Sequence, residues 1–323
     1  MRDGRKKFLI VASGLIAGIL GAHFILDPGD SSRPLETPAD TENQPPVSQP
    51  LAQHLASRPM TAPPGRAELP PRRAPKPAYR PKPAQAPSTG KPADAPKGLV
   101  EFEVIDGDAV AFGDVLLGKP DAGPEVKSGY AEPPVPLLWE KPQIPYVISP
   151  DLPNPGRIQK AFDYFAKHTP VTFVPYQGQK DAIVFQVGTQ HCYSYLGRVG
   201  GLQPLKLAAG CQSQEIIHEL MHALGFVHEQ SRPDRDQYVE IVWNNIEEKY
   251  KEQFMVVPEF FSETSRGAPF DYRSVMMYEP TAFALQPGLI TLKSLNSQPI
   301  SPIHDGLSEG DLKRVNHLFG LPD

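Results

Sequence analysis

Three histidines are concentrated in one short stretch of this chain, HELMHALGFVHEQSRPDRD, which begins at His218. His222 follows four residues later and His228 six residues after that, in a sequence with only nine histidines. Residues four apart on an α-helix share one face, with Cβ atoms about 5–6 Å apart, so the first two imidazoles can reach one atom. Glycine tolerates a left-handed conformation, so Gly225 can end the helix and return the chain with His228 as a third ligand.

The pattern H-E-x-x-H-x-x-G-x-x-H predicts a metal site rather than three independent core histidines. A chance match to this long pattern is much rarer than a chance match to H-E-x-x-H alone. Three nitrogen ligands leave one position of Zn²⁺ open, which is typical of a catalytic zinc site. Zn²⁺ lowers the pKa of a bound water to about 7. Glu219, turned about 100° from His218 along the helix, can then accept a proton from that water.

Apolar periodicity indicates the elements that must hold these residues. Residues 214–224 should form a helix that is apolar nearly all round and therefore buried. Residues 157–168 have the pattern of an amphipathic helix, and SEGD at 308–311 has the form of a capping box before a third helix. Apolar runs typical of strands lie at 144–148, 171–176 and 181–187. This mixture predicts an α+β fold.

Charge is distributed unevenly along the chain. Residues 1–98 hold 14 Lys/Arg against 8 Asp/Glu, whereas the remaining residues hold 18 against 29. An acidic folded part argues against nucleic acid as a partner. The two cysteines, Cys192 and Cys211, would be thiols in a cytosolic protein and would pair in an exported one.

The N-terminus has the features of an export signal. MRDGRKK is followed by residues 8–26, which contain no Lys, Arg, Asp or Glu. As a helix these residues would rise about 28 Å, close to the hydrocarbon thickness of a bilayer. No clean cleavage site follows them, so we expect residues 1–26 to be a signal anchor rather than a removed signal peptide. The protein would then be tethered to a membrane, facing the periplasm or exterior, or secreted if the segment is cleaved.

Residues 27–98 contain 18 prolines and almost no periodic apolar pattern. Because proline lacks an amide donor, we expect this stretch to form no helix or sheet ladder and to be an extended, solvated stalk. Its basic part, 58–97, leaves open a second interpretation, in which it contacts an anionic polymer of the cell envelope. The folded part should begin near Leu99.

Several motifs resemble the astacin family of the metzincin metalloproteases, in its bacterial-type form. HEQSRPDRDQYV, at the third histidine, is similar to the astacin signature, and SVMMYEP at 274–280 resembles the astacin Met-turn. CYSYLGR, from Cys192, is similar to the segment before the family's zinc helix. LSEGDLKRVNHLFG resembles its closing helix, so the likeness spans roughly residues 139–323.

The resemblance implies a role for each matched residue. It implies that His218, His222 and His228 bind Zn²⁺ and that Glu219 is the general base. It also implies that Tyr278 joins the metal in the resting enzyme and then swings away to stabilise the oxyanion, since its phenol can donate to developing negative charge.

Other matches concern the surroundings of the metal. Met276 would be the apolar floor of the site, and Glu229 would contact the amine of the mature N-terminus in a buried pocket. The family's usual Met-turn has histidine where Met277 stands, which is not a ligand position. A second disulfide common in the family has no cysteines here, so the resemblance implies a single bridge, Cys192–Cys211.

Astacin pro-segments resemble F-x-G-D, in which the aspartate blocks the zinc. AFGD ends at Asp114, with its phenylalanine displaced by one position, and we expect Asp114 to be the blocking ligand. Asp108 is the competing candidate, and an ordinary Gly-Asp turn remains the simpler interpretation. An activating cut should fall between about Gly118 and Val135.

We therefore expect a zinc endopeptidase that is made as a zymogen and acts on polypeptides bound beside an edge strand. Its metzincin-like domain would have an N-terminal subdomain, with a mixed twisted sheet and two long helices, and a smaller irregular C-terminal subdomain. Two alternatives are a catalytically silent zinc-binding adhesion module of the cell envelope and a polysaccharide-binding wall protein acting through its stalk. The expected division is 1–26 anchor, 27–98 stalk, 99–135 pro-segment and 136–323 catalytic domain.

Overall fold

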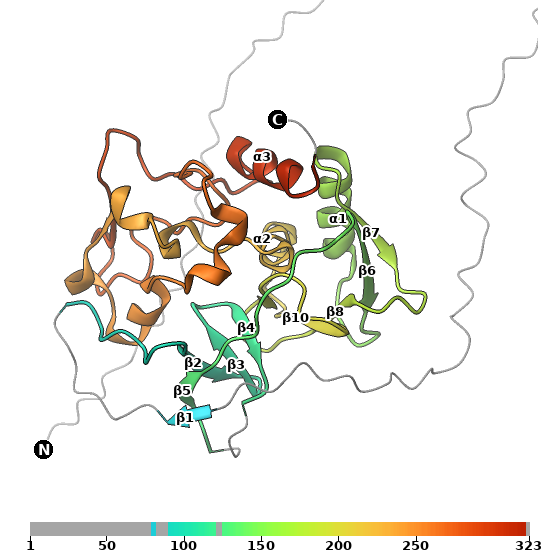
Figure 1. Ribbon diagram of the computed structural model, residues 1–323, viewed down its shortest axis with the longest axis horizontal. Coiled ribbons are helices and arrows are strands. Elements are labelled where there is room, and N and C mark those ends of the chain that lie inside the picture. The colour runs from blue at the N-terminus through green and yellow to red at the C-terminus, as the bar shows by residue number, and fades with distance from the viewer. Residues whose placement is uncertain (1–78, 82–89, 121–124, 321–323) are drawn as a thin grey trace, which may run out of the picture. The chain divides into compact units, whose positions relative to one another are not determined.

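The computed structural model describes residues 79–81, 90–120 and 125–320, which all lie in one compact unit, residues 68–323. One mixed ten-stranded sheet organises this unit (Figure 1). Its strands are β1 (Tyr79–Pro81), β2 (Val100–Ile105), β3 (Asp108–Ala111), β4 (Val115–Gly118), β5 (Ser128–Ala131), β6 (Gln143–Ile148), β7 (Thr172–Pro175), β8 (Ala182–Val187), β9 (Tyr193–Tyr195) and β10 (Leu202–Leu207). Their order is β1-β5-β2-β3-β4-β9-β10-β8-β6-β7.

The downstream half of the sheet carries two helices. Strands β10, β8, β6 and β7 pair in parallel, and β9 pairs antiparallel with β10. Helix α1 (Gly156–His168) contacts β7 and helix α2 (Ser213–Leu224). It buries Ile158, Phe162 and Phe165, the apolar face that its periodicity indicated. The predicted α+β class, with a mixed sheet and two helices in the first subdomain, is confirmed, as are the strands predicted at β6, β7 and β8.

A smaller irregular part follows α2, as expected. Short 3₁₀ helices and a two-stranded sheet, β11 (Val239–Ile241) with β12 (Leu292–Ser294), surround a separate apolar core. In the view of Figure 1, α2 lies between this part and strands β6 and β7. Helix α3 (Glu309–Leu318) closes the chain and buries Val315 in the main core. The predicted capping box is confirmed, since Asp311 N donates to Ser308 Oγ at 2.9 Å and Ser308 N donates to Asp311 Oδ2 at 3.1 Å.

Strands β2 to β5 form an antiparallel sheet that continues the downstream one. β4 joins the two by pairing in parallel with β9, with Val115 opposite Ser194. β2 begins at Val100, and the expected start of the folded part near Leu99 stays a prediction. The prediction that the stalk forms no sheet ladder is wrong at Tyr79–Pro81, which pair with Ser128–Ala131. β1 is an edge strand, and an edge strand tolerates proline because it needs hydrogen bonds on one side only.

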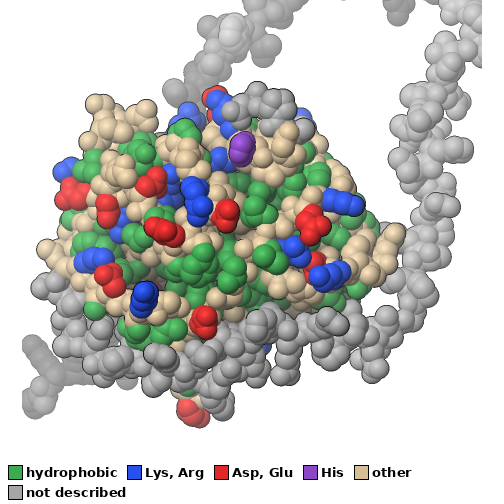
Figure 2. Space-filling view, viewed as in Figure 1, with side chains coloured by type: hydrophobic (Ala, Val, Ile, Leu, Met, Phe, Trp, Pro, Cys, Tyr) green, Lys and Arg blue, Asp and Glu red, His purple; other side chains and the backbone are tan. Residues whose placement is uncertain are grey.

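The predicted anchor and most of the stalk, residues 1–78 and 82–89, lie outside the described residues. Among the residues that are described, no helix has the length and apolar character to cross a membrane. On the face seen in Figure 2, positively and negatively charged side chains are interspersed. No charge of a single sign dominates that face.

Candidate metal centre

Helix α2 places the first two histidines on one face and then reverses the chain. Its first turn is held by Gln212 N, which donates to Glu215 Oε2 at 2.8 Å. Gly225, with φ 105°, ends the helix, and its N–H donates to the carbonyl of His222 at 2.8 Å. A Cβ there would also approach Leu138 and Thr264 side chains to 3.1–3.2 Å. Glycine therefore meets both the conformational and the steric demand at this turn, as its place in the motif predicted.

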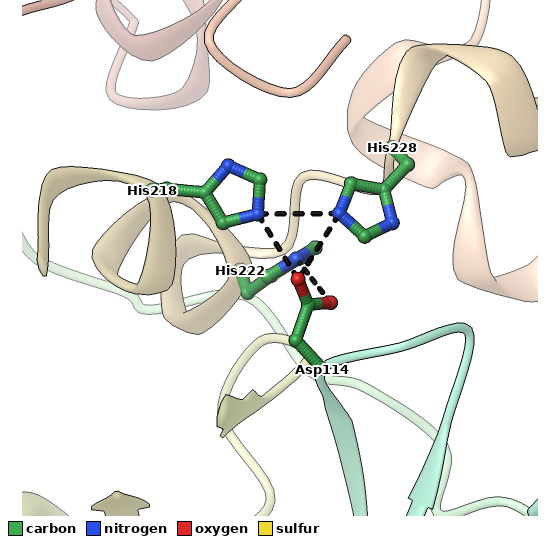
Figure 3. A group of neighbouring side chains, drawn as sticks. All are labelled: Asp114, His218, His222 and His228. Atoms are coloured by element: carbon green, nitrogen blue, oxygen red, sulfur yellow. Dashed lines mark hydrogen bonds and ion pairs between the residues drawn. The ribbon is translucent and has the colours of Figure 1, made fainter. Parts of the chain in front are cut away.

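The reversal brings the three histidines together, and Asp114 meets them from the start of β4 (Figure 3). His218 Nε2 and His228 Nε2 lie 3.2 Å apart. Asp114 Oδ2 lies 3.3 Å from each of these nitrogens, and Asp114 Oδ1 lies 3.0 Å from His222 Nε2. Three side chains of one short stretch and one from far upstream thus meet at a common point.

Hydrogen bonds behind the rings fix their orientation. His218 Nδ1 lies 3.0 Å from the carbonyl of Val275, and His222 Nδ1 lies 2.8 Å from the carbonyl of Phe226. A carbonyl can only accept, so each Nδ1 donates to it, and each Nε2 is the ring atom that faces the cluster. This is the arrangement in which a histidine binds a metal.

The cluster fits a tetrahedral metal ion. An ion with bonds of about 2.0–2.1 Å separates its four donors by about 3.3 Å, and the four distances given above range from 3.0 to 3.3 Å. Among the described residues, His222 Nε2 and Asp114 Oδ1 are buried and have no hydrogen-bond partner of acceptable geometry. Three nitrogens and one carboxylate oxygen form a donor set suited to Zn²⁺.

Glu219 lies beside the cluster on α2 and is 2% exposed. Its Oε2 is buried and has no hydrogen-bond partner among the described residues. Burial, followed by the charges of Asp114 and Glu215, raises the pKa of Glu219 well above its usual value. A carboxyl group with a raised pKa and a free oxygen is suited to accept and return a proton.

Tyr278 packs its ring against the His228 ring, with centroids 4.8 Å apart. Its hydroxyl donates to the carbonyl of Phe112 at 3.3 Å. A Cβ on Gly113 would lie 2.9 Å from this hydroxyl, and φ of Gly113 is 96°. The Phe112-Gly113-Asp114 turn thus contacts Tyr278 as well as the histidines, and the predicted bond between Tyr278 and the metal stays a prediction.

The Met-turn is held in place by Asp311 of α3, a link that the sequence did not reveal. Met276 is 1% exposed and belongs to the main core. Ser274 Oγ donates to Asp311 Oδ1 at 2.6 Å, and Val275 N donates to Asp311 Oδ2 at 2.9 Å. Since the carbonyl of Val275 orients His218, α3 supports the cluster indirectly. The sequence identified Asp311 only as part of a capping box.

Glu229 is fully buried and already has cationic partners. Arg232 Nη1 lies 3.1 Å from Glu229 Oε2, Arg314 Nη1 bonds to Glu229 Oε1, and Asp271 N donates to Oε2 at 3.3 Å. Arg314 and Asp271 also line a cavity of about 1070 Å³, together with Leu138. The predicted contact of Glu229 with an N-terminal amine stays a prediction.

The competing candidate Asp108 lies apart from the histidines. Its carboxylate is 2.7 Å from Lys119 Nζ and accepts from Tyr193 Oη at 3.1 Å. Cys192 and Cys211 form a disulfide that links the start of β9 to the loop before α2. Of the two aspartates considered, only Asp114 is placed at the cluster.

Comparisons with known proteins agree with this geometry. The model of the astacin family, peptidase family M12A, matches residues 135–320. The zinc metalloproteinase nas-13 of Caenorhabditis elegans is 40% identical over 189 residues, covering 58% of this chain and 42% of that protein. Meprin A subunit alpha of Rattus norvegicus is 35% identical over 228 residues, covering 69% of this chain and 29% of that protein. The chain thus spans less than half the length of these two relatives.

A solved structure supports the same assignment. High choriolytic enzyme 1, a hatching enzyme zinc-protease from Oryzias latipes, matches with a TM-score of 0.52 and 34% identity, over 57% of this chain and 95% of that one. These relatives are animal proteins, so the expected bacterial type stays a prediction. Since the family model covers more than half of the sequence and ends beyond α3, the chain belongs to the astacin family.

Proposed function

We propose that this chain is a zinc endopeptidase that hydrolyses peptide bonds in polypeptide substrates. The observation that carries the proposal is the convergence of three histidine Nε2 atoms on one point, with a carboxylate of an upstream segment as the fourth donor. His218, His222 and His228 would hold Zn²⁺. When bound, this ion supplies Lewis acidity, which activates a water and polarises the substrate carbonyl.

Glu219 then transfers the proton between the water and the leaving group. Its free, buried oxygen accepts a proton from the attacking water and later delivers it to the amine that leaves. Tyr278 is held by the carbonyl of Phe112 in the uncut chain. Once Phe112 is displaced, the phenol is free to donate to the oxyanion that develops on the substrate carbonyl.

The same geometry supports synthesis as a zymogen. Asp114 occupies the fourth donor position at the histidines, and β4 covers β9, the edge of the downstream sheet beside which a substrate strand would pair. Residues 99–135 are the pro-segment in this proposal, and residues 136–323 are the catalytic domain. A cut between about Gly118 and Val135 would separate them.

Export is part of the proposal. The disulfide Cys192–Cys211 suits an oxidising compartment. Residues 1–26 would direct export and anchor the chain to a membrane, and the proline-rich stretch 27–98 would act as a spacer. The catalytic domain would then face the periplasm or the exterior.

The function is tested with the full chain after proteolytic activation. We expect one Zn²⁺ per chain by elemental analysis, hydrolysis of a peptide library, and loss of hydrolysis with a chelator. A Glu219→Gln chain should retain the metal and lose hydrolysis. Stoichiometric zinc without hydrolysis of any peptide would instead favour the silent adhesion module, and absence of zinc would refute both.

A further inference from the structure

A second carboxylate of the pro-segment is bound by the catalytic domain, away from the histidines. Asp106 lies in the turn between β2 and β3. Thr189 N donates to Asp106 Oδ2 at 2.9 Å, and Thr189 Oγ1 donates to Asp106 Oδ1. Tyr193 Oη lies 3.3 Å from Asp106 Oδ2. Two donors of Thr189 therefore bind one carboxylate, and the phenol of Tyr193, whose single hydrogen is shared between Asp106 and Asp108, lies beside it.

The groups around this contact also favour a carboxylate. Tyr193 is fully buried, and burial, followed by the charges of Asp108 and Asp106, raises the pKa of its phenol, so the hydroxyl stays a donor. The positive charge of Lys206 acts on Asp106 as well. Lys119 Nζ pairs with Asp108 and donates to the carbonyl of Asp106 at 3.4 Å, which ties the turn to the end of β4.

We infer that Thr189 and Tyr193 form a second carboxylate-binding site of the catalytic domain, and that it helps to keep the pro-segment bound as a non-covalent inhibitor after the chain is cut. The inference rests on the proposed function, in which residues 99–135 are a pro-segment. The ligand class is an acidic side chain in a β-turn, and its occupant in this chain is Asp106.

The second site is separate from the metal centre. Asp106 and Asp114 lie beyond opposite ends of β3, whose four residues span about 13 Å. Effects of substitutions at such a separation usually add independently. Loss of the Asp114 contact would therefore leave the Asp106 contact in place.

A cut does not by itself remove the contacts that hold the pro-segment. A cut between Asp121 and Ala122 would leave β2, β3 and β4 upstream and β5 downstream, yet β5 pairs with β2, and β4 pairs with β9. The upstream residues Phe102 and Phe112 also share an apolar cluster with Phe261 of the catalytic domain. The fragment would thus dissociate as a ligand dissociates, at a rate set by these contacts.

Asp106→Asn is a suitable test substitution. Asp106 has φ 52°, and asparagine adopts this left-handed region more readily than other residues with a Cβ. The substitution keeps the shape of the side chain and removes its charge. Glu103→Gln is the matched control, because Glu103 is an exposed carboxylate on β2 of the same segment.

The experiment uses the full chain with a recognition sequence for a site-specific protease inserted between Asp121 and Ala122. After cutting, size-exclusion chromatography and dilution series would give the dissociation constant of the upstream fragment. We expect co-elution at micromolar concentration, a rise of about tenfold or more in the dissociation constant for Asp106→Asn, and less than twofold for Glu103→Gln. Thr189→Val should raise the dissociation constant as well. The dissociation constant of the double variant should be only slightly higher than that of Asp106→Asn, because both substitutions remove the same contact.

Three outcomes would overturn the inference. The first is release of the fragment on cutting, and the second is an equal change in the dissociation constant for Asp106→Asn and Glu103→Gln. The third is a double variant whose fold-change equals the product of the fold-changes of Asp106→Asn and Thr189→Val. The readout is binding, so it does not depend on hydrolysis. A retained fragment on a protein that never cleaves peptides would refute the proposed function and leave the second site standing.

Discussion

Asp114 Oδ1 lies 3.0 Å from His222 Nε2, although 108 positions separate the two residues in the sequence. His222 is held from behind by the carbonyl of Phe226, and Asp114 directly precedes β4, where its carbonyl accepts from Ser194 N at 3.0 Å. Burial would raise the pKa of Asp114, but the charges of His228 and His222 and hydrogen bonds from the histidines hold it well below its usual value. The carboxylate is therefore ionised, in the form that binds a metal.

Under the proposed function, replacement of this carboxylate should release activity in the uncut chain. We expect Asp114→Ala to raise kcat/KM of the uncut chain on a fluorogenic peptide by at least about tenfold, since a metal-directed anion is lost. The gain in activity should be incomplete, because β4 still pairs with β9 and occupies the edge at which a substrate strand would bind. Glu103→Gln is the control and should stay latent. If Asp114→Ala is as latent as the control, the block lies elsewhere.

Glu219→Gln should separate chemistry from metal binding. Removal of the proton acceptor should lower kcat of the activated protein about 10²–10⁴-fold. Zinc stoichiometry should be unchanged, because the three histidines are intact. The measurements are steady-state kinetics and elemental analysis on the same preparation. Retention of a tenth or more of the original kcat would exclude Glu219 as the general base.

The local parts of the site could be predicted from the sequence because neighbouring residues determine them. The spacing of His218 and His222 on a helix and the turn at Gly225 follow from backbone geometry alone. The place of Asp114 was predicted only through a resemblance, since nothing in AFGD itself indicates which groups it meets. Local chemistry thus defined the ligand set, and the resemblance supplied the long-range contact.

The supporting contacts could not be predicted, because each joins residues that are far apart in sequence. Asp311 was identified as part of a capping box, and it is, but its carboxylate also accepts from Ser274, 37 positions upstream. The edge strand at Tyr79–Pro81 was hidden by the proline-rich stretch around it, and the bond from Thr189 to Asp106 spans 83 positions. Periodicity and motifs carry no information about such pairings.

Asp311 should be important for both stability and metal binding. Its fully buried carboxylate accepts from Ser274 and Val275 and pairs with Arg314. We expect Asp311→Ala to lower the free energy of unfolding by about 3 kcal/mol, because these partners lose a buried acceptor.

The same substitution should weaken zinc binding about 10–100-fold, because Val275 orients His218. Denaturant unfolding and competition with a chelator measure the two effects. Glu309→Ala, an exposed change in the first turn of the same helix, is the control and should change both little. An Asp311→Ala chain with the metal affinity of the control would show that α3 does not support the site.

The disulfide should stabilise the region between β9 and α2. Cys192 and Cys211 are 19 positions apart, and a bridge over a loop of this length contributes about 3 kcal/mol in the chain-entropy model. We expect the double substitution Cys192→Ala with Cys211→Ala to lower the free energy of unfolding by about that amount, measured with guanidinium chloride. Equal unfolding midpoints with and without the bridge would contradict this account.

Acid should weaken the second carboxylate site in a predictable direction. Burial raises the pKa of Asp106, but hydrogen bonds from Thr189 and Tyr193 and the charge of Lys206 lower it by more, so the net shift is downward. In the released fragment the pKa should return to about 3.9. A group whose pKa is lowered in the complex stabilises binding fully above its free pKa, and this contribution is lost as the pH falls through the lowered pKa.

Asp108 and Lys119 also face this turn. The measurement is therefore the ratio of the dissociation constant of the Asp106→Asn fragment to that of the unchanged fragment, because the effects of Asp108 and Lys119 cancel in this ratio. The ratio should be constant from pH 7 to 5 and should begin to fall once the pH drops below the free pKa of about 3.9. A ratio that grows on acidification would mean that Asp106 binds as a protonated group.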